Sequence, residues 1–285
     1  MRYKGRRQSS NIEDRRGIRI GRKTKVGGGL GAIIIIVLFV LLGGDPQEIF
    51  NALQPQQEFA ETATTYQPGT HEQELTEFVS VVLADTEDVW HMIFNNSGMQ
   101  YREPKLVLFN SYAQSACGFS SAATGPFYCP GDERVYIDLQ FLEQLQEKLG
   151  AEGDFAAAYI IAHEVGHHVQ KLLGVLDQVH ELRGVVSETE YNEQTVRLEL
   201  QADFYAGVWA HHAQRMKNIL EEGDIEEAMN AAQAVGDDRI QKQTQGYIVP
   251  DSFTHGTSEQ RMYWFKKGFT TGSVEEGNTF DPGAI

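Results

Sequence analysis

The chain has 285 residues and a formal net charge of −16 at pH 7, a length that suits one domain with a full core. Its charge is divided: residues 1–25 carry ten Lys or Arg and two acids, a net of +8, whereas the rest carries 14 basic and 38 acidic residues, a net of −24. Because so acidic a body repels phosphates, the composition argues against nucleic acid as a partner.

The first predicted element is a membrane span at residues 26–44. The sequence VGGGLGAIIIIVLFVLLGG contains no charged residue, and as a helix it would be about 28 Å long, close to the thickness of a bilayer's hydrocarbon core. Because the basic cluster precedes it, the positive-inside rule places residues 1–25 in the cytoplasm as a tail and everything after Asp45 outside. We therefore expect a single-pass anchor in the cell (inner) membrane and a periplasmic or otherwise extracytoplasmic main domain.

Two alternatives to this anchor are a cleaved signal peptide and a buried soluble helix. The basic region is long for a signal peptide, and GGDPQE after the apolar stretch offers no small-x-small cleavage site. A buried soluble helix rarely follows ten basic residues.

Residues 45–70 lack periodicity, which predicts a linker. A helix at about residues 73–94 and a strand at residues 104–110 follow. Cys117 and Cys129 then lie in a Gly- and Ser-rich segment with eleven residues between them. On the outer side of a membrane a disulfide is permitted, so we expect these two cysteines to form one; two free buried thiols are the alternative.

After a second strand at residues 133–139, the segment FAAAYIIAHEVGHHVQKLL at residues 155–173 reads as one buried helix. Within it His163 and His167 lie four residues apart and therefore share one face, while Glu164 is rotated by about 100°. This His-Glu-x-x-His pattern is typical of zinc peptidases, in which two imidazoles bind the metal and the glutamate is the general base. The alternative is a pair of merely hydrogen-bonded histidines, although such polar groups are costly in an apolar helix unless they are paired or bind metal.

Zinc requires a third protein ligand and an open position for water. A third histidine of the metzincin kind is excluded because Leu173 stands at its place. A second predicted helix at residues 197–206 carries Glu199 and Asp203 on one face. Glu199 is the candidate third ligand of a single Zn²⁺, and Asp203 could accept the free ring N–H of a ligand histidine. Asp203 as the ligand itself is the alternative. The small Ala202 would let this helix approach the first closely.

Near the C-terminus, Thr257 and Gln260 form a capping box that predicts a helix ending near Gly268. His255 precedes this helix and could donate a hydrogen bond to the oxyanion of a tetrahedral intermediate, with Tyr247 as a weaker candidate for the same role. An ordinary loop histidine is the alternative. Residues 273–285 are predicted to be a flexible tail.

Taken together, HEVGHHVQ followed by ELQADFYAGVWA resembles the gluzincin arrangement of His-Glu-x-x-His plus a downstream Glu-x-x-x-Asp. The wider sequence resembles the bacterial neutral zinc metallopeptidase family, in the basic N-terminus and in four further stretches. These are CGFSSAATGPFYCPGDERVYIDLQF, AYIIAHEVGHHVQ, RLELQADFYAGVWAH and FTHGTSEQRMYWFKKGF. The resemblance implies an α+β, zincin-like domain over residues 71–272 that cleaves a peptide or protein substrate. In zincins the strand ahead of the motif helix forms the upper edge of the cleft, a role that would fall to residues 133–139, with which a substrate chain could pair.

The resulting hypothesis is that Glu164 takes a proton from a zinc-activated water that attacks a peptide carbonyl, and then returns it to the leaving amine. Two alternatives stay open: a zinc-stabilised envelope scaffold or partner-binding domain without turnover, and a zinc hydrolase of a non-peptide bond. The intact Glu164 argues against the scaffold, because a structural zinc site has no use for a base.

Overall fold

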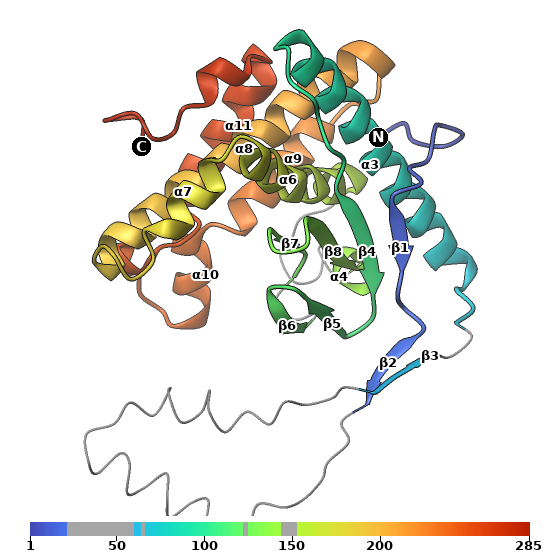
Figure 1. Cartoon of the computed structure of the whole chain (residues 1–285). Coiled ribbons are helices and arrows are strands. Elements are labelled where there is room, and N and C mark those ends of the chain that lie inside the picture. The colour runs from blue at the N-terminus through green and yellow to red at the C-terminus, as the bar shows by residue number, and fades with distance from the viewer. Residues whose placement is uncertain (22–59, 64–65, 122–124, 144–152) are drawn as a thin grey trace, which may run out of the picture. The chain divides into compact units, whose positions relative to one another are not determined.

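A computed structural model describes residues 1–21, 60–63, 66–121, 125–143 and 153–285 (Figure 1). The chain forms two compact units, Met1–Arg15 with Gln67–Ile285, and Arg16–Tyr66. In the smaller unit, strands β2 (Ile18–Gly21) and β3 (Ala60–Ala63) pair in antiparallel fashion. The predicted membrane span at residues 26–44 and most of the predicted linker lie outside the described residues. In the parts of the chain that are described, no helix is both long and apolar enough to cross a bilayer.

The larger unit contains a four-stranded mixed sheet with the strand order β1-β4-β8-β7. Strands β1 (Ile12–Asp14), β4 (Lys105–Phe109) and β8 (Arg134–Asp138) are parallel, and β7 (Phe127–Cys129) is antiparallel to β8. The strands expected at residues 104–110 and 133–139 are thus present as β4 and β8. The expected edge position of β8 is wrong, because β8 lies between β4 and β7, and β7 forms that edge among the described strands.

Alternation along β4 and β8 divides the core between the two faces of the sheet. Leu106 and Leu108 of β4 belong to the main core, which also contains the long helices, whereas Val107 and Phe109 belong to a smaller cluster on the opposite face. The smaller cluster includes Cys129 and therefore lies beside the disulfide.

Six longer helices and several short ones make up the rest of the described part of this unit. The helix expected at residues 73–94 is α3, and the motif helix expected at 155–173 is α6, which begins and ends within one residue of its predicted bounds. Helix α6 packs against α3 and the sheet on one side and against α8 and α9 on the other (Figure 1). The described helical elements are α3 (Thr70–Asn96), α4 (Leu139–Glu143), α6 (Asp154–Leu172), α7 (Val175–Glu181), α8 (Glu188–Lys217), α9 (Asp224–Ala234), α10 (Asp237–Thr244), η2 (Pro250–Ser252), α11 (Ser258–Thr271) and η3 (Val274–Gly277).

Helices α8 and α11 are in backbone contact at two glycines. A Cβ atom on Gly268 would lie 2.1 Å from the carbonyl oxygen of Phe204, and one on Gly207 would lie 2.1 Å from that of Phe265. The prediction that α11 ends near Gly268 is therefore wrong: this glycine provides a close helix crossing, and the helix runs on to Thr271 and ends at Gly272, which has a φ of 62°. The expected capping box between Thr257 and Gln260 is present.

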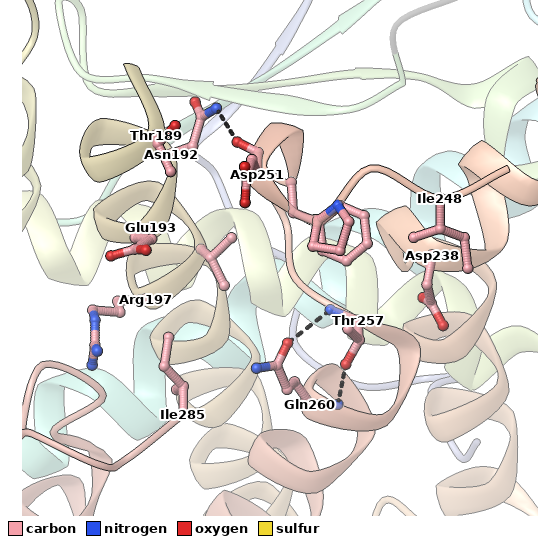
Figure 2. Close-up of a pocket in the computed structure, with 13 residues that line it drawn as sticks. Thr189, Asn192, Glu193, Arg197, Asp238, Ile248, Asp251, Thr257, Gln260 and Ile285 are labelled. Atoms are coloured by element: carbon pink, nitrogen blue, oxygen red, sulfur yellow. Dashed lines mark hydrogen bonds between the residues drawn. The ribbon is translucent and has the colours of Figure 1, made fainter. Parts of the chain in front are cut away.

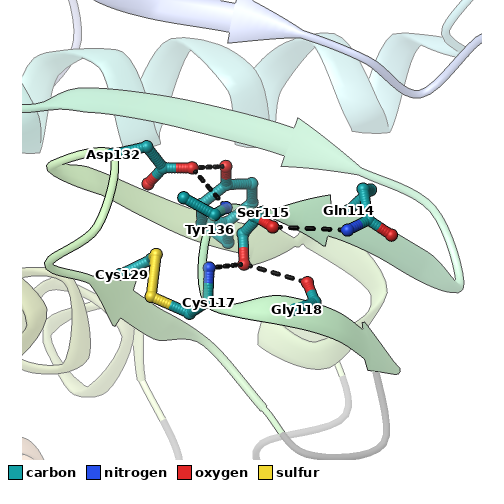
Figure 3. Close-up of a disulfide and its surroundings, with 8 residues drawn as sticks. Gln114, Ser115, Cys117, Gly118, Cys129, Asp132 and Tyr136 are labelled. Atoms are coloured by element: carbon teal, nitrogen blue, oxygen red, sulfur yellow. Dashed lines mark hydrogen bonds between the residues drawn. A yellow bond between two sulfur atoms is a disulfide. The ribbon is translucent and has the colours of Figure 1, made fainter. Parts of the chain in front are cut away.

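Strands β5 (Tyr112–Ser115) and β6 (Gly118–Ser121) form an antiparallel hairpin, and the predicted disulfide joins its turn to strand β7 (Figure 3). The sulfur atoms of Cys117 and Cys129 are 2.01 Å apart and the Cα atoms 5.8 Å apart. The Ser115 hydroxyl accepts a hydrogen bond from the Cys117 N–H (3.1 Å) and donates one to the Gly118 carbonyl (3.0 Å). The bridge therefore fixes the hairpin to the edge of the sheet.

Residues 1–15, expected as the first part of a tail separate from the catalytic domain, are instead part of its fold. Strand β1 pairs with β4, and the arginine side chains that precede it bind carboxylates of α3. The amino group of Met1 binds Asp154 and Asp224, two of three neighbouring carboxylates. The expected beginning of the catalytic domain at residue 71 therefore omits a strand of its sheet.

The C-terminal residues are also packed rather than free, which contradicts the expected flexible tail at 273–285. Thr279 is fully buried, its hydroxyl donates to the Arg197 carbonyl (2.6 Å), and its own carbonyl accepts from the Arg197 guanidinium (2.6 Å). The Gln201 side chain donates to the Gly277 carbonyl (3.0 Å). Residues 277–279 therefore belong to the folded domain, because they form hydrogen bonds with Arg197 and Gln201 of α8.

Candidate metal centre

Helices α6 and α8 bring the three predicted ligands together. Nε2 of His163 lies 3.1 Å from one carboxylate oxygen of Glu199, and Nε2 of His167 lies 3.4 Å from the other. The three ligand atoms lie within 4.8 Å of one another. The helices approach closely because Gly166, one residue before His167, has no Cβ: a Cβ there would lie 3.0 Å from the Ala202 carbonyl oxygen.

The second nitrogen of each imidazole is held by a neighbour. Nδ1 of His163 lies 2.8 Å from Oδ1 of Asp203, and Nδ1 of His167 lies 2.9 Å from Oε1 of Gln170. Because both acceptors take an N–H from Nδ1, Nε2 is in each imidazole the nitrogen left to bind a metal, and both Nε2 atoms lie beside Glu199. Two imidazole nitrogens and one carboxylate form a donor set that suits zinc, and the residues present therefore fit the predicted ion.

The charges of the centre are strongly coupled. Burial acts to lower the pKa of His163, but the Asp203 and Glu199 carboxylates raise it to about 10. Burial acts to raise the pKa of Glu199, but His167 and His163 hold it well below its usual range. The carboxylates of Glu199 and Asp203 thus favour a positive charge at the histidines between α6 and α8.

Asp203 is the hub of a buried network. Oδ1 of Asp203 accepts from the Tyr159 hydroxyl and from Nη2 of Arg261 (2.9 Å), and Oδ2 accepts from Nε of Arg261 (2.7 Å). Burial acts to raise the pKa of Asp203, but the charges and hydrogen bonds of Arg261 and His163 together outweigh it and lower this pKa to about 2. Asp203 therefore stands behind His163 as predicted, and the alternative in which Asp203 is itself the ligand does not fit this geometry.

Arg261 was not among the predicted site residues. It is 3% exposed and lies on α11, 58 residues after Asp203. The sequence does contain a signal: Arg261 shares one face of α11 with the buried Trp264, Phe265 and Gly268. A charged residue on an apolar helix face requires a buried partner.

Glu164 lies one residue along α6 from His163 and is 8% exposed. Burial raises the pKa of its carboxyl, whereas the two ligand histidines and a hydrogen bond from the Tyr128 backbone N–H lower it. Tyr128 is the middle residue of β7, so the edge strand and the predicted base are in direct contact. Its hydroxyl also binds Nδ1 of the buried His168 (3.0 Å), whose other nitrogen lies 2.6 Å from the Arg102 carbonyl. His168 is thus a structural residue, as expected.

His255 lies in the loop before α11, near enough to Glu199 for the charge of that carboxylate to act on it. Asp237 accepts from its backbone N–H (2.6 Å) and lies 3.3 Å from its Nδ1. Burial acts to lower the pKa of His255, but the hydrogen bond to Asp237 and the charge of Glu199 raise it. The side chain is 51% exposed, so it can reach a bound molecule. Tyr247, the weaker candidate, lies on the exposed loop after α10.

A cavity of about 600 Å³ opens between α8, the segment around η2, and the beginning of α11 (Figure 2). Its lining includes Val196 of α8, one turn before Glu199, and Thr257, the N-cap residue of α11, two residues after His255. Ile248, Pro250 and Phe253 add apolar surface from the intervening segment. The lining does not include the three predicted ligands, and the cavity begins one helical turn from Glu199 along α8.

The site combines a His-Glu-x-x-His helix with a glutamate from a second helix, an arrangement that defines the metallopeptidase class. The sequence model of the family described as "Putative neutral zinc metallopeptidase" matches residues 1–280, and the chain belongs to this family.

Two relatives illustrate the extent of the similarity. The uncharacterized protein YpfJ of Escherichia coli (strain K12) is 47% identical over 98% of this chain and 99% of its own length. The uncharacterized protein Rv2575 of Mycobacterium tuberculosis (strain ATCC 25618 / H37Rv) is 43% identical over 63% of each chain. No solved structure matches this chain.

Proposed function

We propose that the protein is a zinc-dependent peptidase in which His163, His167 and Glu199 hold a single zinc ion. The observation that carries the proposal is the convergence of two Nε2 atoms on Glu199 with a buried carboxylate, Glu164, beside them. Zinc at such a site supplies a Lewis acid and makes water a nucleophile near neutral pH.

The residues of the chain then divide the work of proton transfer and charge stabilisation. Glu164 accepts a proton from the attacking water and passes it to the leaving amine, a task that its burial favours by raising its affinity for protons. His255, whose pKa is raised by the hydrogen bond to Asp237 and by the charge of Glu199 against the effect of burial, donates to the developing oxyanion. Asp203 holds His163 in the tautomer that leaves Nε2 free.

The geometry favours β7, rather than β8, as the strand beside which a substrate chain lies. β7 forms the sheet edge next to α6, and the N–H of Tyr128 already points at Glu164. An extended peptide paired with this edge would pass the catalytic carboxylate. The cavity between α8 and α11 would receive a substrate side chain.

We propose that the catalytic domain is located outside the cytoplasm. The disulfide between Cys117 and Cys129 persists in an oxidising compartment. We further propose that the apolar sequence at residues 26–44 attaches the domain to the cell membrane.

The decisive experiment compares purified wild type with Glu164→Gln on a mixture of unfolded protein substrates. We expect Glu164→Gln to retain one zinc per chain and to lose at least about 100-fold in cleavage rate, because a general base contributes about that much. Glu188→Gln, at an exposed position on α8, is the matched control. Equal cleavage by Glu164→Gln and wild type would refute the mechanism. Zinc binding without cleavage by the wild type would instead favour a scaffold.

A further inference from the structure

We infer that residues 1–15 lie on the same side of the membrane as residues 67–285, because strand β1 is part of the same sheet as β4. The larger unit, which contains the candidate metal centre, is called the catalytic unit below. The inference is independent of the proposed catalysis, since it rests only on how the N-terminal segment packs. It rules out the arrangement that the charge pattern predicted, in which a cytoplasmic tail is separated by one membrane crossing from an external domain.

The first support is backbone pairing. Strand β1 lies parallel to β4 in the register Ile12↔Leu106, Glu13↔Val107 and Asp14↔Leu108. The Leu106 N–H donates to the Asn11 carbonyl (2.9 Å), and the Arg15 N–H donates to the Leu108 carbonyl (2.8 Å). Direct N–H···O=C bonds cannot form through a bilayer, so the two strands occupy one compartment whenever this sheet exists.

The second support is a buried carboxylate whose partners come from this segment. Glu87 of α3 is 2% exposed. Among the described residues, it accepts from the Arg7 guanidinium (2.9 Å), the Ser9 hydroxyl and the Asn11 side-chain amide (3.0 Å). Residues 7–11 therefore both cover this carboxylate and supply its hydrogen bonds, as a buried charge requires. Helix α3 is therefore built to receive the N-terminal segment.

The third support concerns the N-terminal basic residues, from which the positive-inside rule predicts a cytoplasmic location. Arg6 binds Asp85 (2.6 Å), which is 1% exposed, and Arg7 binds Asp88 (2.6 Å). Lys217 of α8 binds Asp85 as well (2.9 Å). Because these arginines neutralise acids of the folded domain, their charge is explained without a cytoplasmic location.

The path of the chain completes the argument. Strand β2 ends at Gly21, which pairs with Ala60 at the beginning of β3. The chain therefore leaves β2 and re-enters β3 at one place, and the uncharged residues 26–44 lie between these two points. Because Gly21 and Ala60 are paired, these two points of the chain lie on one side of any membrane to which the protein is attached.

The test is thiol labelling of the full chain in intact spheroplasts with a membrane-impermeant maleimide. Gln8→Cys reports on the N-terminal segment and Val185→Cys on the catalytic unit; both positions are exposed, and Val185 is 76% exposed. The parent chain, with Cys117 and Cys129 in their disulfide, gives the background. We expect the two reporters to be labelled to the same extent before lysis, within about twofold.

Labelling of both reporters, or protection of both until lysis, supports the inference. Labelling of only one of them before lysis overturns it. A double-mutant cycle of Arg7→Met and Glu87→Met, read as thermal stability in whole cells, then tests docking itself. We expect the double variant to melt no more than slightly below Glu87→Met alone, and fully additive losses would overturn the docked arrangement.

Discussion

Replacing Arg261 with methionine would test whether the network behind His163 sets the metal affinity. The substitution keeps the length and apolar stem of the side chain but removes its charge. It also removes the bonds of 2.7 and 2.9 Å to the two oxygens of Asp203. Asp203, which is fully buried, would then keep only His163 and Tyr159 among the partners described above. The carboxylate would be free to rotate, and the imidazole that it orients would lose its fixed direction.

Two magnitudes follow. Loss of an outer partner of a metal ligand weakens metal binding by about 10- to 100-fold, or about 1.4 to 2.7 kcal/mol. Removal of one member of a buried ion pair costs about 3–5 kcal/mol of folding free energy. Arg261→Lys keeps the positive charge, but its single nitrogen cannot bond both oxygens of Asp203 as the planar guanidinium does. We therefore expect its zinc affinity and its stability to lie between those of Arg261→Met and wild type.

Zinc affinity would be measured by competition with a chromogenic chelator, and stability by thermal unfolding with and without zinc. Arg197→Met is the matched control, because Arg197 also bonds across the domain but binds the Thr279 carbonyl, away from the metal ligands. We expect that control to lose stability while its zinc affinity stays within about twofold of wild type. A folded Arg261→Met protein that binds zinc as tightly as wild type would refute the reasoning.

Further predictions address other parts of the site and fold. Cleavage should decline as the pH rises through the raised pKa of His255, and Asp237→Asn should move this alkaline limb of kcat/KM to lower pH by removing the hydrogen bond that raises it; an unmoved limb would show that another group titrates. Cys117→Ser and the reduced wild type should both be less stable than the oxidised wild type, by about 2–4 kcal/mol in denaturant melts, and an unchanged midpoint would contradict a stabilising role for the bridge to Cys129. Gly207→Ala should destabilise by at least about 1–3 kcal/mol, because its methyl group would overlap the backbone of α11, whereas an exposed alanine substitution elsewhere on α8 should be nearly neutral.

Local pattern predicted the parts of the site that lie on single helices. The apolar run around His163 and the four-residue spacing of Glu199 and Asp203 gave both helices and the candidate ligands, because helical periodicity depends only on neighbours in sequence. Arg261 was missed because its partner lies 58 residues away, and only the packing of α11 on α8 brings the two together.

The N-terminal segment was misjudged for the same reason, because the partners of its charged residues are distant in sequence. Its basic residues were interpreted as a membrane signal because their charge was compared with the adjacent apolar stretch and not with distant acids. The matching information lies in α3, where Asp85 and Glu87 interrupt a buried apolar sequence. Strand β7 was also missed: with three residues it is too short for its alternation to be recognised, so β8 was assigned the edge.

The close contact at Gly268 also acts as a pivot. Backbone atoms of α8 and α11 touch there, so α11 cannot slide along α8, and the motion left to it is a tilt about this point. The beginning of α11 at Ser258 lies ten residues away, about 15 Å along the helix axis. A tilt of about 5° would therefore displace that end, and the adjoining His255, by about 1.3 Å. Misplacement by about 1 Å can alter a catalytic rate about 100-fold, so a small tilt of α11 would be enough to change how His255 meets a bound molecule.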